Sequence, residues 1–261
     1  MDKFALWKKA INSKPVNKVM FIEEKCRGKT VLDLGCVRHN ADYAVKDPNW
    51  LHKKIQSVAQ KVIGFDFLQV EVEKLRAVGY NILWGDVTKP LDINEQFDVI
   101  VAGDLLEHLS NFEGFFENCH RLLKQEGILI ISTPNPFYTG VFYGAAFKGL
   151  PLISPEHTCW IDPQCLAQLS TRFDCIISEI YFIQNTWKLP YYIWDSENHP
   201  FDILNEKWTN NSFWFKLKRK VLGLIFTLFY EPYKTLVGTN SKLVKYSDYI
   251  AVLRKSNNAL V

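Results

Sequence analysis

One short stretch of the chain, Val31-Leu-Asp-Leu-Gly-Cys-Val-Arg-His39, combines the pattern of a buried strand with that of a sharp turn. Its apolar run from Thr30 to Leu34 carries an Asp in the middle and stops at Gly35, where the backbone can turn without a Cβ in the way. Such a turn lies at the carboxyl end of a parallel strand, where an open α/β sheet places a ligand. The stretch therefore predicts a strand with a ligand site beside it, and a plain strand and turn is the alternative.

Other apolar runs follow this one at a steady spacing. The run 62–67 comes about thirty residues later, which leaves room for one crossover helix, and its acid Asp66 could accept both hydroxyls of a ribose. The later runs are 81–86, 97–104, 127–134, 174–183 and 248–254. Strands and helices thus alternate, which predicts an α/β fold with a doubly wound, mostly parallel, seven-stranded sheet and helices on both faces.

Four of these stretches resemble the class I S-adenosylmethionine-dependent methyltransferases. The run 31–35 is similar to the first motif of that family, Asp66 to its ribose acid, and Gly85-Asp86 to its adenine-side acid. The run 97–109, Phe-Asp-Val-Ile-Val-Ala-Gly-Asp-Leu-Leu-Glu-His-Leu, is similar to the fourth-strand motif and is the most specific of the four. The resemblance implies a Rossmann-like methyltransferase fold, S-adenosyl-L-methionine as cofactor, and an enzyme that transfers a methyl group.

The first motif departs from the family pattern. The family usually continues it as Gly-x-Gly-x-Gly, whereas Gly35 is followed here by Cys-Val-Arg-His. A subgroup associated with surface-glycan gene clusters looks like this chain, with a Cys-Val-x-His turn, a Trp-Leu-His at 50–52 and a Pro-Glu-His-Thr-Cys-Trp at 155–160. The resemblance to this subgroup implies glycan biosynthesis, with a hydroxyl of a sugar or carrier-linked glycan as the methyl acceptor.

The same motifs imply a set of cofactor-binding residues at the carboxyl edge of the sheet. His39 could contact either the methionine carboxylate of the cofactor or the substrate. Trp50 and His52 could point at the cofactor, and a packed Trp with a surface His is the alternative. The expected cofactor-binding residues are Asp33, Gly35, Cys36, His39, Asp66, Phe67, Gly85, Asp86, Val87 and Gly103.

Three side chains at the end of the fourth expected strand are spaced for chemistry. Asp104, Glu107 and His108 stand at i, i+3 and i+4, so a helix there would project them from one face, where the transferred methyl group should lie. A hydroxyl acceptor must lose its proton near neutral pH. His108 could be a general base held in its tautomer by a carboxylate, or the three side chains could hold a divalent cation. We favour the base and expect no metal; a solvated helix start with no catalytic role is the structural alternative.

His157 is the other candidate catalytic histidine. It follows the aromatic run 137–150, which we interpret as a cover over the substrate side, and it precedes an expected helix. A lone histidine in a loop is commonly structural, but the resemblance places this one over the substrate mouth. The expected catalytic set is therefore Asp104, Glu107, His108 and His157.

Composition and charge restrict the class of protein. The net charge of +3 offers no case for nucleic-acid binding. The Asn/Asp-Pro-Pro-aromatic run of a nucleic-acid amine methyltransferase is also missing after the fourth expected strand. The six cysteines form no Cys-x-x-Cys pair, and the first residues are not a secretory signal. We therefore expect a small-molecule or glycan acceptor, no nucleic acid, and a cytoplasmic protein.

The chain is expected to divide into a core and an insertion. Residues 1–183 and 247–261 should form the methyltransferase core, and 184–246 a helical, aromatic-rich insertion that selects the substrate, forms a homodimer or touches a membrane surface. Within the insertion, 213–230 joins a basic cluster to an apolar run too short to span a bilayer. That run fits either a peripheral helix at the inner face of the membrane or a buried or dimer-contact helix.

Helical periodicity predicts further elements between the strands. Residues 3–25 should form helix over the sheet, and 40–60 a loop followed by a helix capped by Asn49. Residues 67–79 should form another helix, and 105–124 should be helical in two pieces with a fresh cap at Ser110-Asn111.

Two interpretations from different classes remain. The first is an S-adenosylmethionine-dependent O-methyltransferase that uses a positioned His and carboxylate set. The second is a non-catalytic module with the cofactor fold that acts as a membrane-associated partner in glycan assembly. The altered turn favours the module, whereas Asp66, Asp86 and Glu107-His108 favour the enzyme.

Overall fold

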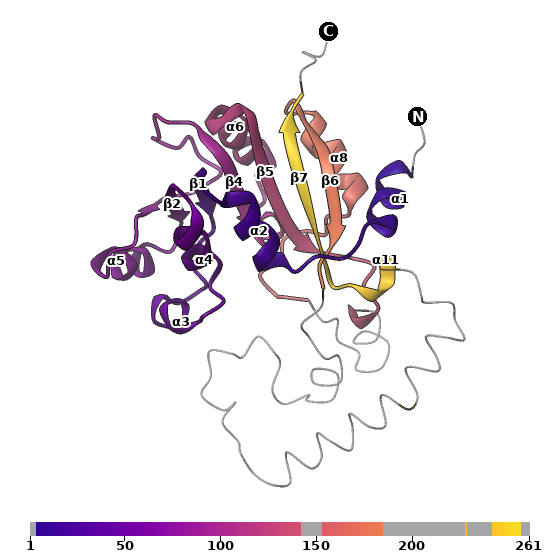
Figure 1. Ribbon diagram of the computed structural model, residues 1–261, viewed down its shortest axis with the longest axis horizontal. Helices are drawn as coiled ribbons and strands as arrows, with labels where there is room; N and C mark the ends of the chain where they lie inside the picture. The colour runs from indigo at the N-terminus through magenta and orange to yellow at the C-terminus, as the bar shows by residue number, and fades with distance from the viewer. Residues whose placement is uncertain (1–3, 142–152, 185–227, 229–241, 257–261) are drawn as a thin grey trace. The chain divides into compact units, whose positions relative to one another are not determined.

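The computed structural model describes residues 4–141, 153–184, 228 and 242–256 (Figure 1). The chain separates into two compact units, the first made of Met1–Asn135, His157–Gln184 and Asp248–Val261, the second of Pro136–Glu156 and Asn185–Ser247. The first unit holds the sheet and all the expected site residues. In the second unit, the described residues include the short helix α11 (Lys242–Lys245), where the Thr139 hydroxyl donates to the Val244 carbonyl at 2.9 Å.

The first unit is built on a seven-stranded sheet with the order β3-β2-β1-β4-β5-β7-β6. The strands are β1 (Thr30–Leu34), β2 (Lys61–Asp66), β3 (Ile82–Trp84), β4 (Phe97–Gly103), β5 (Leu123–Pro134), β6 (Cys175–Phe182) and β7 (Asp248–Lys255). Strands β1 to β5 pair in parallel, while β7 is antiparallel to both β5 and β6. The mostly parallel, doubly wound sheet is therefore confirmed, and its strand order reverses between β1 and β4, which is where such sheets bind ligands.

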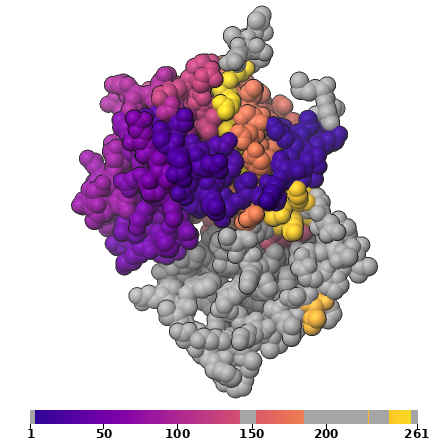
Figure 2. All heavy atoms as spheres, viewed as in Figure 1, coloured from indigo at the N-terminus to yellow at the C-terminus, as the bar shows by residue number. Residues whose placement is uncertain are grey.

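The central strands are apolar on both faces because helices cover both. Leu32, Ile100 and Leu129 stand opposite one another on β1, β4 and β5, and each is 0% exposed. In Figure 1, α2 lies in front of the sheet, while α6 and α8 lie behind it. Figure 2 shows the indigo atoms of α1 and α2 as a band across the front of this unit.

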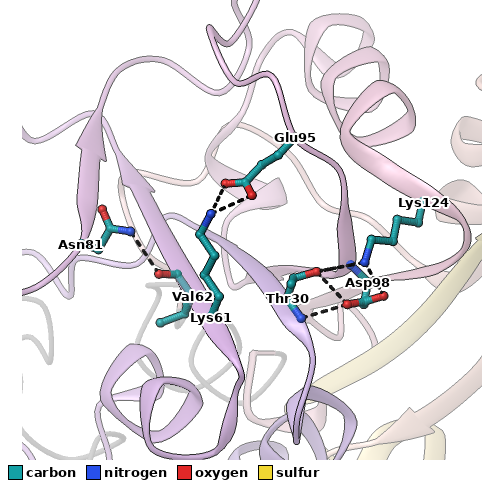
Figure 3. Close-up of polar contacts among 7 residues, drawn as sticks. All are labelled: Thr30, Lys61, Val62, Asn81, Glu95, Asp98 and Lys124. Carbon is teal, nitrogen blue, oxygen red and sulfur yellow. Dashed lines mark hydrogen bonds and ion pairs between the residues drawn. The ribbon is translucent and has the colours of Figure 1, made fainter.

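The amino ends of the strands carry a network of polar contacts (Figure 3). The Asp98 carboxylate accepts hydrogen bonds from the Thr30 backbone N–H at 2.9 Å, from the Thr30 hydroxyl at 2.6 Å and from Lys124 Nζ at 2.8 Å. Partial burial opposes ionisation, but these donors outweigh it and hold the pKa of Asp98 well below its usual value. Lys61 pairs nearby with Glu95 at 2.7 Å. These contacts stabilise the edge opposite to the expected ligand site.

The expected helix over residues 3–25 is in fact two helices, α1 (Ala5–Asn12) and α2 (Lys18–Cys26). Pro15 lies between them, and because proline lacks a backbone N–H and fixes φ it does not continue a helix interior. The chain is extended at Val16, which forms an isolated bridge with Ile183. The Asn17 side chain then starts α2 by accepting from the Met20 N–H at 3.1 Å.

The expected loop in 40–60 holds a helix of its own. Asn40 caps α3 (Ala41–Lys46) through its side-chain oxygen, which accepts from the Tyr43 N–H at 3.0 Å. The expected cap at Asn49 is wrong, because α4 (Leu51–Val58) begins after Trp50 with no side-chain cap. Helix α4 faces the sheet, since Ile55 is 0% exposed in a core cluster with residues of the strands.

The remaining helices begin at capping side chains or end before a glycine. Helix α5 (Gln69–Ala77) ends before Gly79, whose φ is +95°. Residues 105–124 do form two pieces, but the first is a single 3₁₀ turn, η1 (Leu106–His108), and the second is α6 (Phe112–Leu122), capped by Asn111. Helix α8 (Pro163–Thr171) is capped by Asp162. The shape of η1 decides where the candidate catalytic side chains point.

Several predictions lie outside the described residues. They concern most of the cover 137–150, nearly all of the insertion 184–246 and nearly all of 213–230. Within the described residues, no helix has the length and apolar character needed to cross a bilayer. Substrate selection, dimerisation and membrane contact by the insertion stay predictions.

Candidate functional site

The turn after β1 keeps one glycine and packs the next two side chains inward. Gly35 adopts a φ of +69°, and an added Cβ there would come within 2.9 Å of Leu105 Cδ1. Cys36 and Val37 are 6% and 7% exposed and belong to a core cluster with Trp50. His39 is exposed with a φ of +57°, so it lies on the open side of the turn. The Cys36 side chain therefore packs into the core and does not face the ligand edge.

Asp66 stands at the carboxyl end of β2, beside this turn. Its carboxylate accepts hydrogen bonds from the Val37 N–H at 2.8 Å and from the Leu68 N–H at 3.1 Å. Asp66 is only 3% exposed. Burial raises the pKa of Asp66 despite these backbone donors. A carboxylate has about four acceptor positions, so these donors leave capacity for a ribose hydroxyl.

Two exposed aromatic rings flank Asp66, one from the next residue in the chain and one from the neighbouring strand β3. Phe67 is 70% exposed and Trp84 55% exposed, and the Trp84 indole N–H donates to the Phe67 carbonyl at 3.1 Å. Asp86 is exposed and accepts the Thr88 N–H at 2.8 Å, while Val87 is buried. Gly85 joins β3 to this turn. Flat apolar faces next to an acid suit a purine ring stacked at the edge of the sheet.

Asp33 and His52 form a buried pair beneath the turn. His52 Nδ1 lies 2.9 Å from Asp33 Oδ2, and the residues are 0% and 2% exposed. The Trp50 indole N–H donates to the Cys36 carbonyl at 2.8 Å. A packed Trp is thus confirmed, but the surface position considered for His52 is wrong, because α4 carries its ring into the core.

Asp104 follows β4 in a left-handed conformation, with a φ of +53°. Its carboxylate accepts from the Ser132 hydroxyl at 2.7 Å and forms an ion pair with Lys18 of α2. Partial desolvation opposes ionisation, yet the Lys18 ammonium and the Ser132 hydroxyl lower the pKa of Asp104. Gly103, the last residue of β4, lies next to the same Lys18 side chain. Asp104 is therefore a neutralised, anchored carboxylate.

Glu107 points into the protein and not along a common helix face. It is 2% exposed, and its Oε2 accepts from the Thr133 hydroxyl at 2.9 Å. Burial, with a further contribution from the charge of Asp104, raises the pKa of Glu107 to about 8. The expectation of one shared α-helical face is wrong, because η1 is a 3₁₀ turn that follows a left-handed residue. The shift favours the protonated form of the Glu107 carboxyl near neutral pH.

His108 and His157 come together at this edge. Their rings meet edge to face, with centroids 4.8 Å apart and planes at 88°. The loop that carries His157 is fixed by Thr158, whose N–H donates to the Glu107 carbonyl at 2.8 Å and whose hydroxyl donates to the Leu109 carbonyl at 2.7 Å. Distant parts of the chain thus bring two imidazoles next to a protonated carboxyl.

Two groups of potential metal ligands occur among the described residues. In each group the ligand atoms lie within 4.8 Å of one another; the groups are Glu107, His108 and His157, and Asp33, Cys36 and His52. The triplet of Asp104, Glu107 and His108 considered as a cation site is not one of them. Asp104 is instead held by Lys18 and Ser132.

Some site residues have no clear signal in the sequence. Lys18 begins α2 and resembles any solvated lysine, so its pairing with Asp104 could not be inferred. Ser132 and Thr133 interrupt the apolar run of β5 at its carboxyl end, and this polar break could have indicated a site. Thr158 lies inside the quoted 155–160 stretch and fixes the loop.

Comparison with known proteins gives consistent results. The family described as a methyltransferase domain matches residues 7–179. A probable S-adenosylmethionine-dependent methyltransferase of Mycolicibacterium smegmatis is 30% identical over 117 residues, which cover 44% of this chain and 41% of that protein. A ubiquinone biosynthesis O-methyltransferase of Glaesserella parasuis is 26% identical over 182 residues, 62% of this chain and 73% of that protein.

A solved structure has the same fold. The S-adenosylmethionine-dependent methyltransferase from Archaeoglobus fulgidus superimposes with a TM-score of 0.52 at 17% identity, covering 91% of each chain. The Rossmann-like methyltransferase fold implied by the resemblance is therefore confirmed. At this identity the likeness concerns the fold alone.

Proposed function

This chain belongs to the class I S-adenosylmethionine-dependent methyltransferase family, and from that premise we propose that it methylates a hydroxyl group of a small-molecule acceptor, a sugar or a carrier-linked glycan. The cofactor is S-adenosyl-L-methionine. The observation that supports this proposal most directly is the contact between the rings of His108 and His157 beside Glu107. This contact lies at the tip of β4, where the strand order of the sheet reverses.

The residues at the carboxyl edge fit this cofactor. Asp66 offers acceptor positions for the ribose, and the exposed rings of Phe67 and Trp84 offer faces for the adenine. His39, exposed at the end of the turn, would contact the methionine end. When bound, S-adenosyl-L-methionine supplies a methyl group on a positively charged sulfur.

The histidine pair supplies the base that a hydroxyl acceptor requires. We assign proton removal to a ring nitrogen of His108, with His157 orienting the acceptor from the loop above it. Glu107 holds its own proton near neutral pH, so it serves as a hydrogen-bonding group and not as the base. Asp104 is tied to Lys18 and Ser132, so it shapes the end of β4 and is not itself free to accept the proton.

A divalent cation held by Glu107, His108 and His157 is the alternative route to a deprotonated hydroxyl. Because the pKa of Glu107 is raised, binding of such a cation would release the carboxyl proton and would weaken at acidic pH. Retained activity in the presence of a strong chelator supports the base, and loss of activity that is restored by Mg²⁺ supports the cation.

The non-catalytic module is the second candidate function. The backbone donors already on Asp66 favour it, because they use acceptor positions that a ribose would need. Calorimetric titration with S-adenosylmethionine and S-adenosylhomocysteine separates the two. Micromolar binding supports the enzyme, and no binding by folded protein supports the module.

The acceptor is tested with radiolabelled cofactor on a panel of free sugars, nucleotide sugars, phenols and primary amines. Transfer to a sugar hydroxyl supports the glycan acceptor implied by the resemblance. Transfer to amines alone would contradict O-methylation while leaving the methyltransferase activity intact.

A further inference from the structure

The turn that should contact the cofactor lacks the glycines that usually shape it, yet it is tightly held. Gly35 is followed by three residues that carry a Cβ at 36–38 and by His39 in the left-handed region. A glycine-rich turn reaches its shape because its residues have no Cβ to collide with the backbone or the ligand. Here other parts of the chain must impose the shape.

Two side chains from the start of α4 contact the turn from below. The Trp50 indole N–H donates to the Cys36 carbonyl at 2.8 Å, and His52 Nδ1 lies 2.9 Å from the Asp33 carboxylate at the end of β1. Both side chains are buried, at 2% and 0% exposure, so water does not compete for these bonds. One helix start thus fixes the strand end and the turn together.

A glycine in β2 makes room for this arrangement. An added Cβ at Gly64 would come within 2.6 Å of Cys36 Sγ and 2.9 Å of His52 Cε1. A glycine inside a strand costs stability unless something packs against its bare backbone, and here the turn and the histidine do so. The other nitrogen of the ring, His52 Nε2, has no partner among the described residues, so Asp33 alone sets the hydrogen bonding of the ring.

The turn is joined to the ribose acid as well. The Val37 N–H donates to Asp66 at 2.8 Å, so a shift of the Cys36 peptide would move a donor away from the carboxylate. The contacts therefore form a chain from α4 through the turn to Asp66.

We propose that Trp50 and His52 are positioning residues of the cofactor site, which hold the turn at 35–39 in its binding shape through the Cys36 carbonyl and the Asp33 carboxylate. This inference rests on the proposed function, because it takes the turn as the cofactor contact. It also gives a physical reason why a Trp-Leu-His accompanies the Cys-Val-x-His turn in this sequence. The Trp and His side chains donate the hydrogen bonds that hold the turn and the strand before it.

The test is calorimetric binding of S-adenosylhomocysteine to wild type and to variants of the full chain. Trp50→Phe keeps an aromatic ring and removes the N–H, and His52→Leu removes the Nδ1 donor. Each should weaken binding by about five- to tenfold, the equivalent of one hydrogen bond. His52→Asn, whose amide can donate from the position of Nδ1, should restore most of the affinity.

The matched control is Asp98→Asn, which weakens hydrogen bonds to Thr30 at the opposite end of the same strand (Figure 3). It should lower the melting temperature and leave the affinity unchanged. Hydrogen exchange of the 36–39 amides should quicken in Trp50→Phe and not in the control. This readout separates positioning from general loss of stability.

The possible results distinguish a failure of this inference from a failure of the proposed function. If wild type binds S-adenosylhomocysteine and both Trp50→Phe and His52→Leu bind it equally well, the positioning role is wrong and the methyltransferase stands. If Asp98→Asn loses as much affinity as they do, the effect is one of stability and the role is again wrong. If folded wild type binds no cofactor, the proposed function fails, and this inference fails with it.

Discussion

The ring of His157 stands edge to face against the ring of His108, with the two centroids 4.8 Å apart. One histidine ends the 3₁₀ turn after β4 and the other belongs to the loop before α8. Thr158 links them by bonding the Glu107 and Leu109 carbonyls. A loop residue thus becomes a neighbour of the strand tip where methyl transfer is proposed.

The first prediction concerns this pair. His108→Ala should slow methyl transfer by about a hundredfold or more, because the acceptor hydroxyl loses its base, while the affinity for S-adenosylhomocysteine stays near wild type. His157→Ala should have a smaller effect that is concentrated in the KM for the acceptor. Single-turnover kinetics and calorimetry provide both values. Normal turnover in His108→Ala together with lost turnover in His157→Ala would exchange the two roles.

The second prediction concerns the ribose acid. Asp66→Ala should weaken cofactor binding by about tenfold or more, because it removes both the ribose acceptor and the partner of the Val37 N–H. Asp86→Ala is the comparison in the turn after β3, where the exposed Asp86 carboxylate accepts a hydrogen bond from the Thr88 N–H of the same turn. Equal calorimetric affinity of Asp66→Ala and wild type would overturn the assignment of Asp66.

The third prediction is a pH dependence of stability. Glu107 binds its proton in the folded protein up to a pKa of about 8, against 4.5 as its ordinary value. Folding therefore takes up a proton between these two values, and stability should fall as the pH rises through this range. Glu107→Gln mimics the protonated carboxyl, so it should remove this loss and stabilise the protein near pH 8 by on the order of 4 kcal/mol.

Thermal unfolding of wild type and Glu107→Gln from about pH 5 to about pH 8.5 measures this difference directly, since all other titrating groups are common to both. The two melting temperatures should converge at the acidic end and diverge at the basic end. Parallel curves would mean that the carboxyl is ionised in the fold.

The fourth prediction compares two glycines with nearly the same backbone conformation. Gly35 and Gly28 have φ values of +69° and +66°, but only at Gly35 would an added Cβ meet a neighbour, Leu105 Cδ1 at 2.9 Å. Gly28→Ala should cost about 1 kcal/mol from the left-handed backbone alone. Gly35→Ala should cost about 1–2 kcal/mol more, because Leu105 must move.

Cofactor binding adds a second distinction between these variants. Gly35→Ala should also weaken S-adenosylhomocysteine binding, whereas Gly28→Ala should leave it unchanged. Chemical denaturation and calorimetry on the same preparations give both quantities. Equal losses of affinity in the two variants would remove Gly35 from the binding site.

Local sequence patterns predicted the strands of the sheet and where they end. The apolar runs that end at Gly35, Asp66 and Gly103 each formed a parallel strand, and their carboxyl ends meet at one edge because parallel strands run in the same direction. The helix after Asp66 and the stop at Gly79 also followed from periodicity and glycine chemistry.

Errors arose where short signals compete. Asn40 caps α3, a helix that the sequence pattern did not predict, whereas the expected cap Asn49 is not used because α4 begins after Trp50. The i, i+3, i+4 spacing of Asp104, Glu107 and His108 presupposed an α-helix. A left-handed Asp104 and a 3₁₀ turn replaced it, because Ser132 and Lys18 bind the Asp104 carboxylate.

The sequence by itself determined the fold class and the edge of the sheet where the site lies, since strand periodicity and strand-ending residues act within a few positions of one another. The cofactor was implied by the resemblance of its motifs to a known family. Tertiary structure alone decided that Lys18 neutralises Asp104, that His157 meets His108, and that His52 lies under the turn against Asp33. These pairs join residues far apart in the chain, and their contacts depend on how helices and loops pack against the finished sheet.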